Sequence, residues 1–246
     1  MCVNPGFYNM DCMEAMREFP DGFFDLAIVD PPYGDGNQNI GWGVRFGQRF
    51  DRYKHPLPAE ELPQTRRNVG GYANWRNVGD EIRKKIVAWD VAPEQDYFDE
   101  LFRVSRYQII WGGNYFNLPP SRNFIIWRKL SISENFSMAM AEYAWTNIIG
   151  NAKVFECTPQ GTANEQRFHP TQKPIKLYSW LLSKYAKPGD KILDTHVGSA
   201  SSLIACHRAG LEYWGFEIDP IYYKAAKERL DRETAQVNIM DILQEV

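Results

Sequence analysis

The chain has 246 residues, of which 44% are hydrophobic and 24% charged, as is ordinary for a soluble globular protein of one large or two small domains. Its net charge of −3 excludes a protein that binds nucleic acid through a basic surface all round. We find no signal peptide and no apolar run long enough to cross a membrane, so we expect a cytoplasmic protein without a membrane partner.

The four cysteines indicate neither a disulfide framework nor a metal site. Cys2, Cys12, Cys157 and Cys206 are scattered and form no CxxC pair. We therefore expect a reducing compartment and no bound metal.

The first third of the chain joins a regular unit to an irregular one. DCMEAMREFP (residues 11–20) predicts a short helix, and FFDLAIVD (residues 23–30) predicts a buried strand that ends at Asp30. Residues 34–88 have little periodicity and carry ten basic against six acidic side chains, with single aromatics between them. A local basic excess of four in an acidic protein indicates an anionic partner.

Strands and helices then alternate to the end of the chain. We expect helices over residues 93–106, 174–186, 199–209 and 221–233, and strands over residues 107–113, 123–129, 142–149, 191–194 and 212–219, with a polar, irregular stretch at 147–168. This alternation predicts an α/β fold with a mostly parallel sheet. In such sheets ligands bind beyond the carboxyl ends of the strands, so Asp30, Gly112–Asn114, Asp194 and Glu217 should converge on one edge.

A small-residue loop between a strand and a helix indicates a nucleotide-like cofactor. ILDTHVGSASS places Asp194 at a strand end before Gly198 and Ser199, and the next strand ends in the acid Glu217. Small residues let backbone N–H groups approach a ligand, and a distant carboxylate can accept two ribose hydroxyls. The pattern also fits an ordinary strand–turn–helix with an N-cap serine.

The strand that ends at Asp30 runs into the sequence DPPY, residues 30–33. The Asp30 carboxylate and the Pro31 carbonyl can accept the two hydrogens of an amino group, because proline supplies no competing N–H. Tyr33 can stack on a planar base. A strand cap followed by a rigid turn, the alternative interpretation, needs neither the acid nor the aromatic ring.

These motifs resemble those of the amino-type DNA methyltransferases, which use S-adenosylmethionine to methylate adenine N6 or cytosine N4. The order of DPPY early and the Asp194 loop late is similar to their circularly permuted β class, and HPTQKP (residues 169–174) and MDCMEAM (residues 10–16) also match. The resemblance implies a Rossmann-like class I methyltransferase fold, with a mostly parallel seven-stranded sheet and helices on both faces. It implies one catalytic domain over residues 1–246, with a basic insertion at 34–88 and a short target-recognition segment at 147–168.

The resemblance also implies the role of each site residue. Asp30, Pro31, Pro32 and Tyr33 would hold a base flipped out of double-stranded DNA, and S-adenosylmethionine would be bound by Asp11, Cys12, Asp30, Thr171, Lys173, Asp194, His196, Gly198, Ser199 and Glu217. Among these, Thr171 and Lys173 would reach the carboxylate of the cofactor, although Lys173 could also be a solvated surface charge. Phosphate contacts would come from the insertion, through Arg45, Arg49, Arg66 and Arg67, unless that segment is a lid over the cofactor. The family often forms dimers, which makes a homodimer a candidate assembly.

Two departures from the family pattern affect the cofactor loop. Thr195-His196 replaces the usual Pro-Phe, so His196 either fills the place of the aromatic ring or acts in catalysis. Gly198-Ser199-Ala200 replaces Gly-Ser-Gly, which would strain the loop if Ala200 needs a positive φ.

In the family, aspartate before Pro-Pro-Tyr usually accompanies adenine and serine accompanies cytosine, so we expect N6-adenine methylation of DNA. N4-cytosine methylation stays an alternative. Three other functions remain open: RNA adenine methylation, methylation of a protein side-chain amide, and a non-catalytic cofactor-binding subunit. Protein methylation would favour asparagine at position 30, and a partner subunit would favour a degraded DPPY motif.

Overall fold

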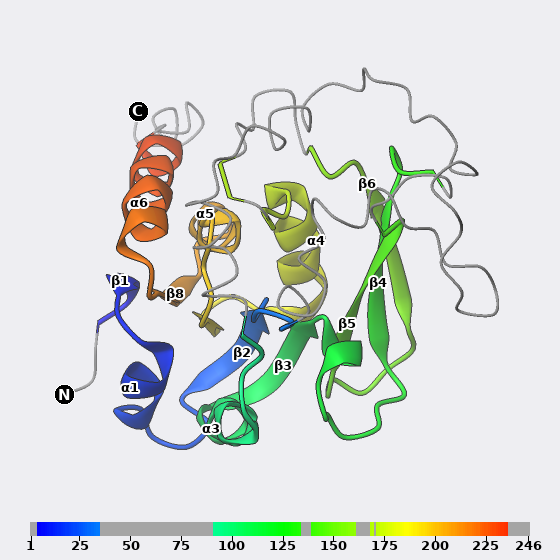
Figure 1. Ribbon diagram of the computed structural model, residues 1–246. Helices are drawn as coiled ribbons and strands as arrows, with labels where there is room; N and C mark the ends of the chain where they lie inside the picture. The colour runs from blue at the N-terminus through cyan, green and yellow to red at the C-terminus, as the bar shows by residue number, and fades with distance from the viewer. Residues whose placement is uncertain (1–3, 35–90, 134–138, 161–167, 170, 236–246) are drawn as a thin grey trace, which may run out of the picture. The chain divides into compact units, whose positions relative to one another are not determined.

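The computed structural model describes residues 4–34, 91–133, 139–160, 168–169 and 171–235 (Figure 1). The chain divides into two compact units, residues 1–31 with 94–246, and residues 32–93. The described part of the second unit is limited to residues 32–34 and 91–93, so the fold below is that of the first unit. The basic insertion predicted at 34–88 lies, apart from Gly34, outside the described residues.

The described part of the first unit is built on one eight-stranded sheet. The strands lie in the order β1-β8-β7-β2-β3-β5-β4-β6. Their bounds are β1 Gly6–Asn9, β2 Phe24–Val29, β3 Ser105–Trp111, β4 Phe124–Lys129, β5 Ala141–Thr146, β6 Lys153–Cys157, β7 Lys191–Asp194 and β8 Glu212–Glu217. Seven of these strands run in one direction, and β5 runs antiparallel to both of its neighbours. The prediction of a mostly parallel α/β sheet is thus confirmed.

The sheet has more strands than expected. β6 lies in the stretch that was predicted to be irregular, and it is an edge strand on which Lys153, Val154 and Glu156 are exposed. β1 has four residues, of which one is buried. Neither strand has the apolar alternation that marks a half-buried strand, which explains why the sequence pattern predicted only the other six strands. The count of seven that the resemblance implied is one too few.

Helices cover both faces of the sheet, as predicted (Figure 1). The helices are α1 Cys12–Arg17, α3 Gln95–Val104, α4 Ile175–Tyr185, α5 Ser201–Arg208 and α6 Pro220–Thr234, with a short 3-10 helix, η4, at Gly113–Tyr115. Helices α4, α5 and α6 pack with Leu26, Ile28 and Ile109 on one face. Helices α1 and α3 pack with Ala27, Val29 and Ile110 on the other. Because successive strand residues point to opposite faces, the near-continuous apolar run of β2 serves both cores.

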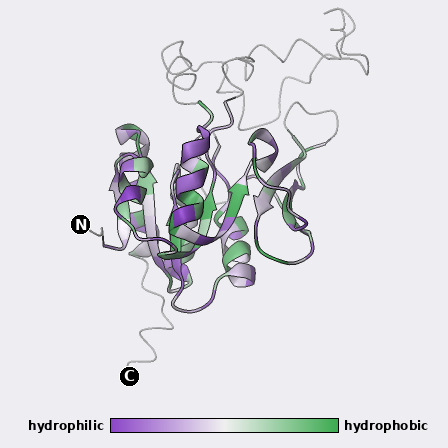
Figure 2. Cartoon of the chain, turned by 90° about the horizontal axis from the view of Figure 1, so that it is seen from below, coloured by the Kyte–Doolittle hydropathy of each residue, from purple (hydrophilic) through white to green (hydrophobic). Residues whose placement is uncertain are grey.

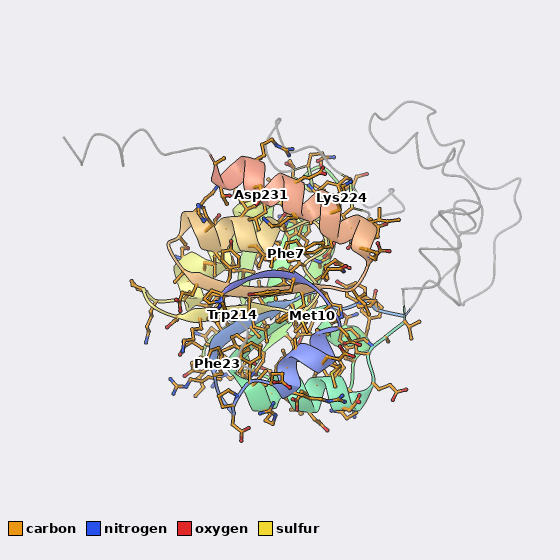
Figure 3. The ribbon with its side chains drawn as sticks, turned by 90° about the vertical axis from the view of Figure 1, so that its left-hand side faces the viewer. Phe7, Met10, Phe23, Trp214, Lys224 and Asp231 are labelled. Carbon is orange, nitrogen blue, oxygen red and sulfur yellow. The ribbon has the colours of Figure 1, made fainter. Side chains whose placement is uncertain are left out.

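The pictures show this two-sided packing. In Figure 2 the hydrophobic residues concentrate in the central strands. In Figure 3, Phe7 lies on the side of the sheet that α6 covers, whereas Trp214 and Phe23 lie on the opposite side. Lys224 and Asp231 lie on the outer side of α6.

One predicted boundary is wrong for a local reason. The helix expected over residues 93–106 ends at Val104, because Ser105 already pairs with Phe24 as the first residue of β3. The Ser105 hydroxyl donates to the Leu101 carbonyl at 2.5 Å, which satisfies one acceptor of the last helical turn.

Parallel strands bring the predicted residues to one edge of the sheet. β1, β8, β7, β2 and β3 are parallel neighbours, so Asp30, Asp194, Glu217 and Gly112 follow or end strands at the same edge. Gly112 has φ 68, and a Cβ on Gly113 would lie 2.4 Å from the Cβ of Trp145. These two glycines therefore let β3 turn sharply against β5 at this edge.

Candidate active site

The first part of the site is the carboxylate that follows β2. Oδ2 of Asp30 forms an ion pair with Nζ of Lys173, which lies just before α4. Lys173 is 4% exposed, and its ammonium lies 5.2 Å from the centroid of the Trp111 ring. The alternative that Lys173 is a solvated surface charge is therefore wrong. The structure gives it Asp30 as a partner, whereas its predicted contact with a cofactor carboxylate stays a prediction.

The ion pair continues into β5 and β4. Nζ of Lys173 also lies 3.2 Å from Oε2 of Glu142, whose Oε1 lies 2.5 Å from Nζ of Lys129. Burial alone would raise the pKa of Glu142, but the ammoniums of Lys173 and Lys129 hold it below its ordinary value. Burial would likewise lower the pKa of Lys173, and the carboxylates of Asp30 and Glu142 raise it above the ordinary value. The four side chains form one row of alternating charges.

The second part of the site is the loop between β7 and α5. Oδ1 of Asp194 accepts a hydrogen bond of 3.0 Å from the backbone N–H of His196, and Oδ2 accepts one from the Ser202 hydroxyl. Burial raises the pKa of Asp194 to about 7, against the lowering effect of these two hydrogen bonds. Asp194 therefore folds the loop back over the end of its own strand.

The loop makes two left-handed turns. Gly198 has φ 55, and a Cβ there would lie 3.2 Å from Cε1 of His169. Thr171 contacts the same ring, with its hydroxyl oxygen 3.2 Å from Nδ1 of His169. Ala200 has φ 62, which in a residue with a side chain costs about 1–2 kcal/mol. The expected strain is thus present, and the N-cap of α5 is Ala200, without a side-chain hydrogen bond, rather than a serine.

The third part of the site joins β8 to β1. Oε2 of Glu217 accepts a hydrogen bond of 2.9 Å from the N–H of Gly198, and Oε1 accepts one of 3.0 Å from Asp219. Asn9, paired with Glu217 across the two strands, leads into Asp11, whose carboxylate caps α1 through the N–H of Met13 at 2.7 Å. Burial, then the nearby charge of Asp11, raise the pKa of Cys12 to about 12, so its thiol is neutral. Asp11, Cys12, Gly198 and Glu217 are thereby brought together, as predicted.

His196 forms an aromatic contact beneath the loop. Its ring lies edge-on to Tyr97 of α3, with centroids 5.4 Å apart, and its Nδ1 lies 2.9 Å from Oγ1 of Thr195. Oγ1 of Thr195 also lies 2.6 Å from the Tyr97 hydroxyl. Burial lowers the pKa of His196 to about 4. A neutral ring packed on an aromatic supports the interpretation that His196 fills the place of the usual aromatic residue.

We expect His196 to make the fold sensitive to acid. Below pH 6.5 the unfolded chain binds a proton at this residue, whereas the folded protein binds it only near pH 4. The free energy of unfolding should therefore fall by up to about 3 kcal/mol as the pH is lowered between these values. Urea unfolding at several pH values should show a shallower fall for His196→Phe than for the wild type. Parallel curves for the two proteins would contradict this assignment.

Arg229 is a site residue that the sequence interpretation missed. This arginine of α6 is 3% exposed, and its guanidinium donates to the carbonyl of Ser199 at 2.7 Å and to the hydroxyl of Ser201 at 2.9 Å. It thus binds the residues on both sides of the strained Ala200. The available signal was a basic residue on the apolar face of a helix, since Ala226 and Leu230 lie on that same face.

Replacing Arg229 with methionine should lower the free energy of unfolding by about 2–3 kcal/mol, because the Ser199 carbonyl loses a buried donor. Arg232→Met, at an exposed position of the same helix, is the matched control and should change it by less than about 0.5 kcal/mol. Denaturant titration of both variants measures the difference. Equal effects in the two variants would show that the loop does not depend on Arg229.

For several predicted site residues the contacts described above support no role in binding or catalysis. Pro32 and Tyr33 follow Pro31 in the chain but belong to the second unit. Arg45, Arg49, Arg66 and Arg67 lie outside the described residues. Ser199 belongs to the loop, and its hydroxyl lies 3.2 Å from that of Ser201. The roles of all these residues stay predictions.

The described ranges contain neither a candidate metal site nor a candidate membrane-spanning helix. No group of three or more His, Cys, Asp or Glu side chains is placed there so that it could hold a metal ion. No helix in the same ranges is long and apolar enough to span a membrane.

The residues at this edge fit S-adenosylmethionine. A Cβ on Gly198 would lie 3.2 Å from Cε1 of His169, so the loop passes close to that ring, and the buried Asp194 and half-buried Glu217 carboxylates hold the loop through its backbone N–H groups. Carboxylates suit the ammonium and the ribose hydroxyls of this cofactor. The fold and these residues define an S-adenosylmethionine-dependent methyltransferase.

The chain belongs to the DNA methylase family of N6 and N4 methyltransferases, since the family model matches residues 69–228, more than half of its length. A relative named as methylase YubD, of Escherichia coli (strain K12), is 23% identical over 232 residues, which are 91% of this chain and 89% of the relative.

Two solved structures share the fold. The cytosine-N4-specific PvuII DNA methyltransferase has a TM-score of 0.52 at 13% identity, covering 96% of this chain and 93% of that enzyme. M1.HpyAVI in complex with SAM has a TM-score of 0.51 at 17% identity, covering 92% of this chain and 98% of the other. The protein is therefore a DNA methyltransferase that acts on a base amino group, and the methyl donor of its family is S-adenosylmethionine.

Proposed function

We propose that the protein methylates the exocyclic N6 amino group of adenine in double-stranded DNA, and that it belongs to the circularly permuted class of these enzymes. The observation that carries the proposal is the Asp30 carboxylate, paired with the buried Lys173 at the sheet edge that also holds the Asp194 loop. An ionised carboxylate is a strong hydrogen-bond acceptor, as an adenine amino group requires. The aspartate at this position, rather than a serine, favours adenine over cytosine.

The residues of the DPPY motif would act by positioning the amino group. Asp30 and the Pro31 carbonyl accept its two hydrogens, which favours a more tetrahedral nitrogen with an available lone pair. Tyr33 stacks on the flipped base and offsets part of the few kcal/mol that unstacking costs. When bound, S-adenosylmethionine supplies the methyl group as an electrophile on sulfur.

The cofactor would be held by the loop and by the two flanking strands. Asp194 would accept hydrogen bonds from the cofactor ammonium, and Glu217 would accept them from the ribose hydroxyls. Asp11 and Cys12 would border its adenine ring. Gly198 would provide the close backbone approach, and His169 with Thr171 would cover the loop from the other side.

The proposal is tested by transfer of a tritiated methyl group to unmethylated genomic DNA and, in parallel, to total RNA. The labelled base is identified by hydrolysis and chromatography. Labelled N6-methyladenine in DNA is the expected result. Labelled N4-methylcytosine would select the second candidate function, which the shared fold of the cytosine-N4-specific PvuII enzyme supports. Label in RNA alone, or no transfer despite cofactor binding, would overturn DNA methylation by this chain.

A further inference from the structure

The row of alternating charges at the sheet edge extends beyond the residues that hold a base or a cofactor. Asp30, Lys173, Glu142 and Lys129 come from the end of β2, the segment before α4, the start of β5 and the end of β4. The two lysines are 4% and 6% exposed. Each ammonium lies about equally far from a tryptophan ring, 5.2 Å for Lys173 over Trp111 and 5.1 Å for Lys129 over Trp127. Water is thus largely replaced around both cations by carboxylates and ring faces.

Lys173 is the member of this row that two carboxylates share. Its Nζ contacts Oδ2 of Asp30 and lies 3.2 Å from Oε2 of Glu142. Without the ammonium, two half-buried carboxyl groups would face one another, and like charges so placed bind a proton between them near neutral pH. A protonated Asp30 would be a hydrogen-bond donor, which is the wrong partner for an amino group.

We propose that Lys173 is a positioning residue for methyl transfer, whose ammonium keeps Asp30 and Glu142 ionised together so that Asp30 meets the target amino group as an acceptor. This inference rests on the proposed function. It differs from the role that the motif resemblance implies, in which Lys173 binds the carboxylate of the cofactor. Lys129 supports the arrangement from behind, because it neutralises the second oxygen of Glu142 at 2.5 Å.

Other ionisable groups also face Asp30. Asp194 of β7 lies within electrostatic reach of it, and so do the buried hydroxyls of Tyr97 on α3 and Tyr178 on α4. Burial raises the pKa of both tyrosines well above the ordinary value, so neither adds charge at neutral pH. Asp194 adds a further negative charge as it ionises, which increases the need for a cation beside Asp30.

The test compares Lys173→Met with the double variant Lys173→Met/Glu142→Gln. In the single variant we expect kcat at pH 7 to fall about 10²-fold and to recover as the pH rises, because the acidic limb of the kcat profile moves up by at least about one pH unit. Removing the second carboxylate should then restore kcat at pH 7 by about tenfold or more. Lys129→Met, which removes an ammonium paired with Glu142 alone, is the matched control and should shift the limb less.

Two measurements separate the roles of Lys173. If Lys173 binds the cofactor instead, Lys173→Met will weaken S-adenosylmethionine binding in calorimetry by more than about tenfold. In that case the added Glu142→Gln substitution will not restore kcat at pH 7. The proposal is overturned by such a loss of cofactor affinity, by a double variant that does not recover kcat, or by an unshifted pH profile of kcat. If Lys173→Met fails to fold, Lys173→Arg takes its place in the test. Arginine keeps the positive charge, so the acidic limb of the kcat profile should stay where it is in the wild type. A shifted limb in this variant would also overturn the proposal.

A readout without catalysis distinguishes this inference from the proposed function. Infrared spectra of the unliganded proteins at pH 7 should show an additional carboxylic-acid carbonyl band in Lys173→Met that is missing from the wild type and weakened in the double variant. A wild type that methylates no DNA adenine contradicts the proposed function, whatever the spectra show. A Lys173→Met spectrum without the band contradicts the inference, whatever the wild type methylates.

Discussion

Replacing Asp30 with asparagine should lower kcat for methyl transfer about 10²- to 10³-fold, a loss of the size seen when one preorganised polar contact to a reacting group is removed. Asparagine has nearly the same shape, but its amide lacks the charge and presents an N–H₂ group where a second acceptor oxygen stood. Lys173 keeps Glu142 as a partner, so the variant is expected to fold. Single-turnover transfer of a labelled methyl group to DNA measures the chemical step directly.

Asp25→Asn is the matched control for this experiment. Asp25 lies near the start of the same strand, at the opposite edge of the sheet, where its carboxylate accepts from the N–H of Lys191 at 3.0 Å. An asparagine oxygen can accept that bond equally, so kcat should stay within about twofold of the wild type. A wild-type rate in Asp30→Asn would remove Asp30 from the chemical step.

Replacing Glu217 with alanine should weaken S-adenosylmethionine binding about 10²-fold, which corresponds to about 3 kcal/mol for charge-assisted hydrogen bonds to the ribose. The fold should suffer as well. The N–H groups of Gly198 and Asp219 both lose their acceptor, and the free energy of unfolding should fall by about 2–4 kcal/mol. Titration calorimetry and denaturant unfolding measure the two losses separately.

The control for Glu217 lies on the same strand. Glu212→Ala removes an exposed carboxylate at the start of β8, at the other edge of the sheet, and should leave cofactor affinity unchanged. Equal cofactor affinity in Glu217→Ala and Glu212→Ala would leave Glu217 with a structural role in the loop alone.

The sequence predicted those parts of the site whose residues are close neighbours in the chain. A buried strand ending in an acid, followed by two prolines, determines where Asp30 lies, and a strand followed by small residues determines the loop after Asp194. The parallel sheet then brings both to one edge, because successive crossovers leave all strand ends on the same side. The sequence also predicted the strained backbone at Ala200, because an alanine stands there in place of the glycine of the family pattern.

The contacts across the sheet could not be predicted in the same way. Glu142 is 31 positions before Lys173, and Asp30 is farther still from both, so their meeting depends on the strand order and on the reversal of β5. Nothing in the local pattern around Arg229 tells which loop its side chain contacts. The two missed strands, β1 and β6, lie at the two ends of the sheet order, where polar side chains face solvent and the apolar pattern fades.

The reversed direction of β5 also determines which connections between strands lie at the functional edge of the sheet. Because β5 runs against its neighbours, the connection from Lys129 to Ala141 leaves and re-enters the sheet at the functional edge. The connection from Cys157 to Ile175 starts at that same edge, since β6 is parallel to β4. Insertions or deletions in either connection would therefore change the surface around Asp30 without disturbing the strands. Evolution can therefore change the length of these two connections and leave the ladder of paired strand residues as it is.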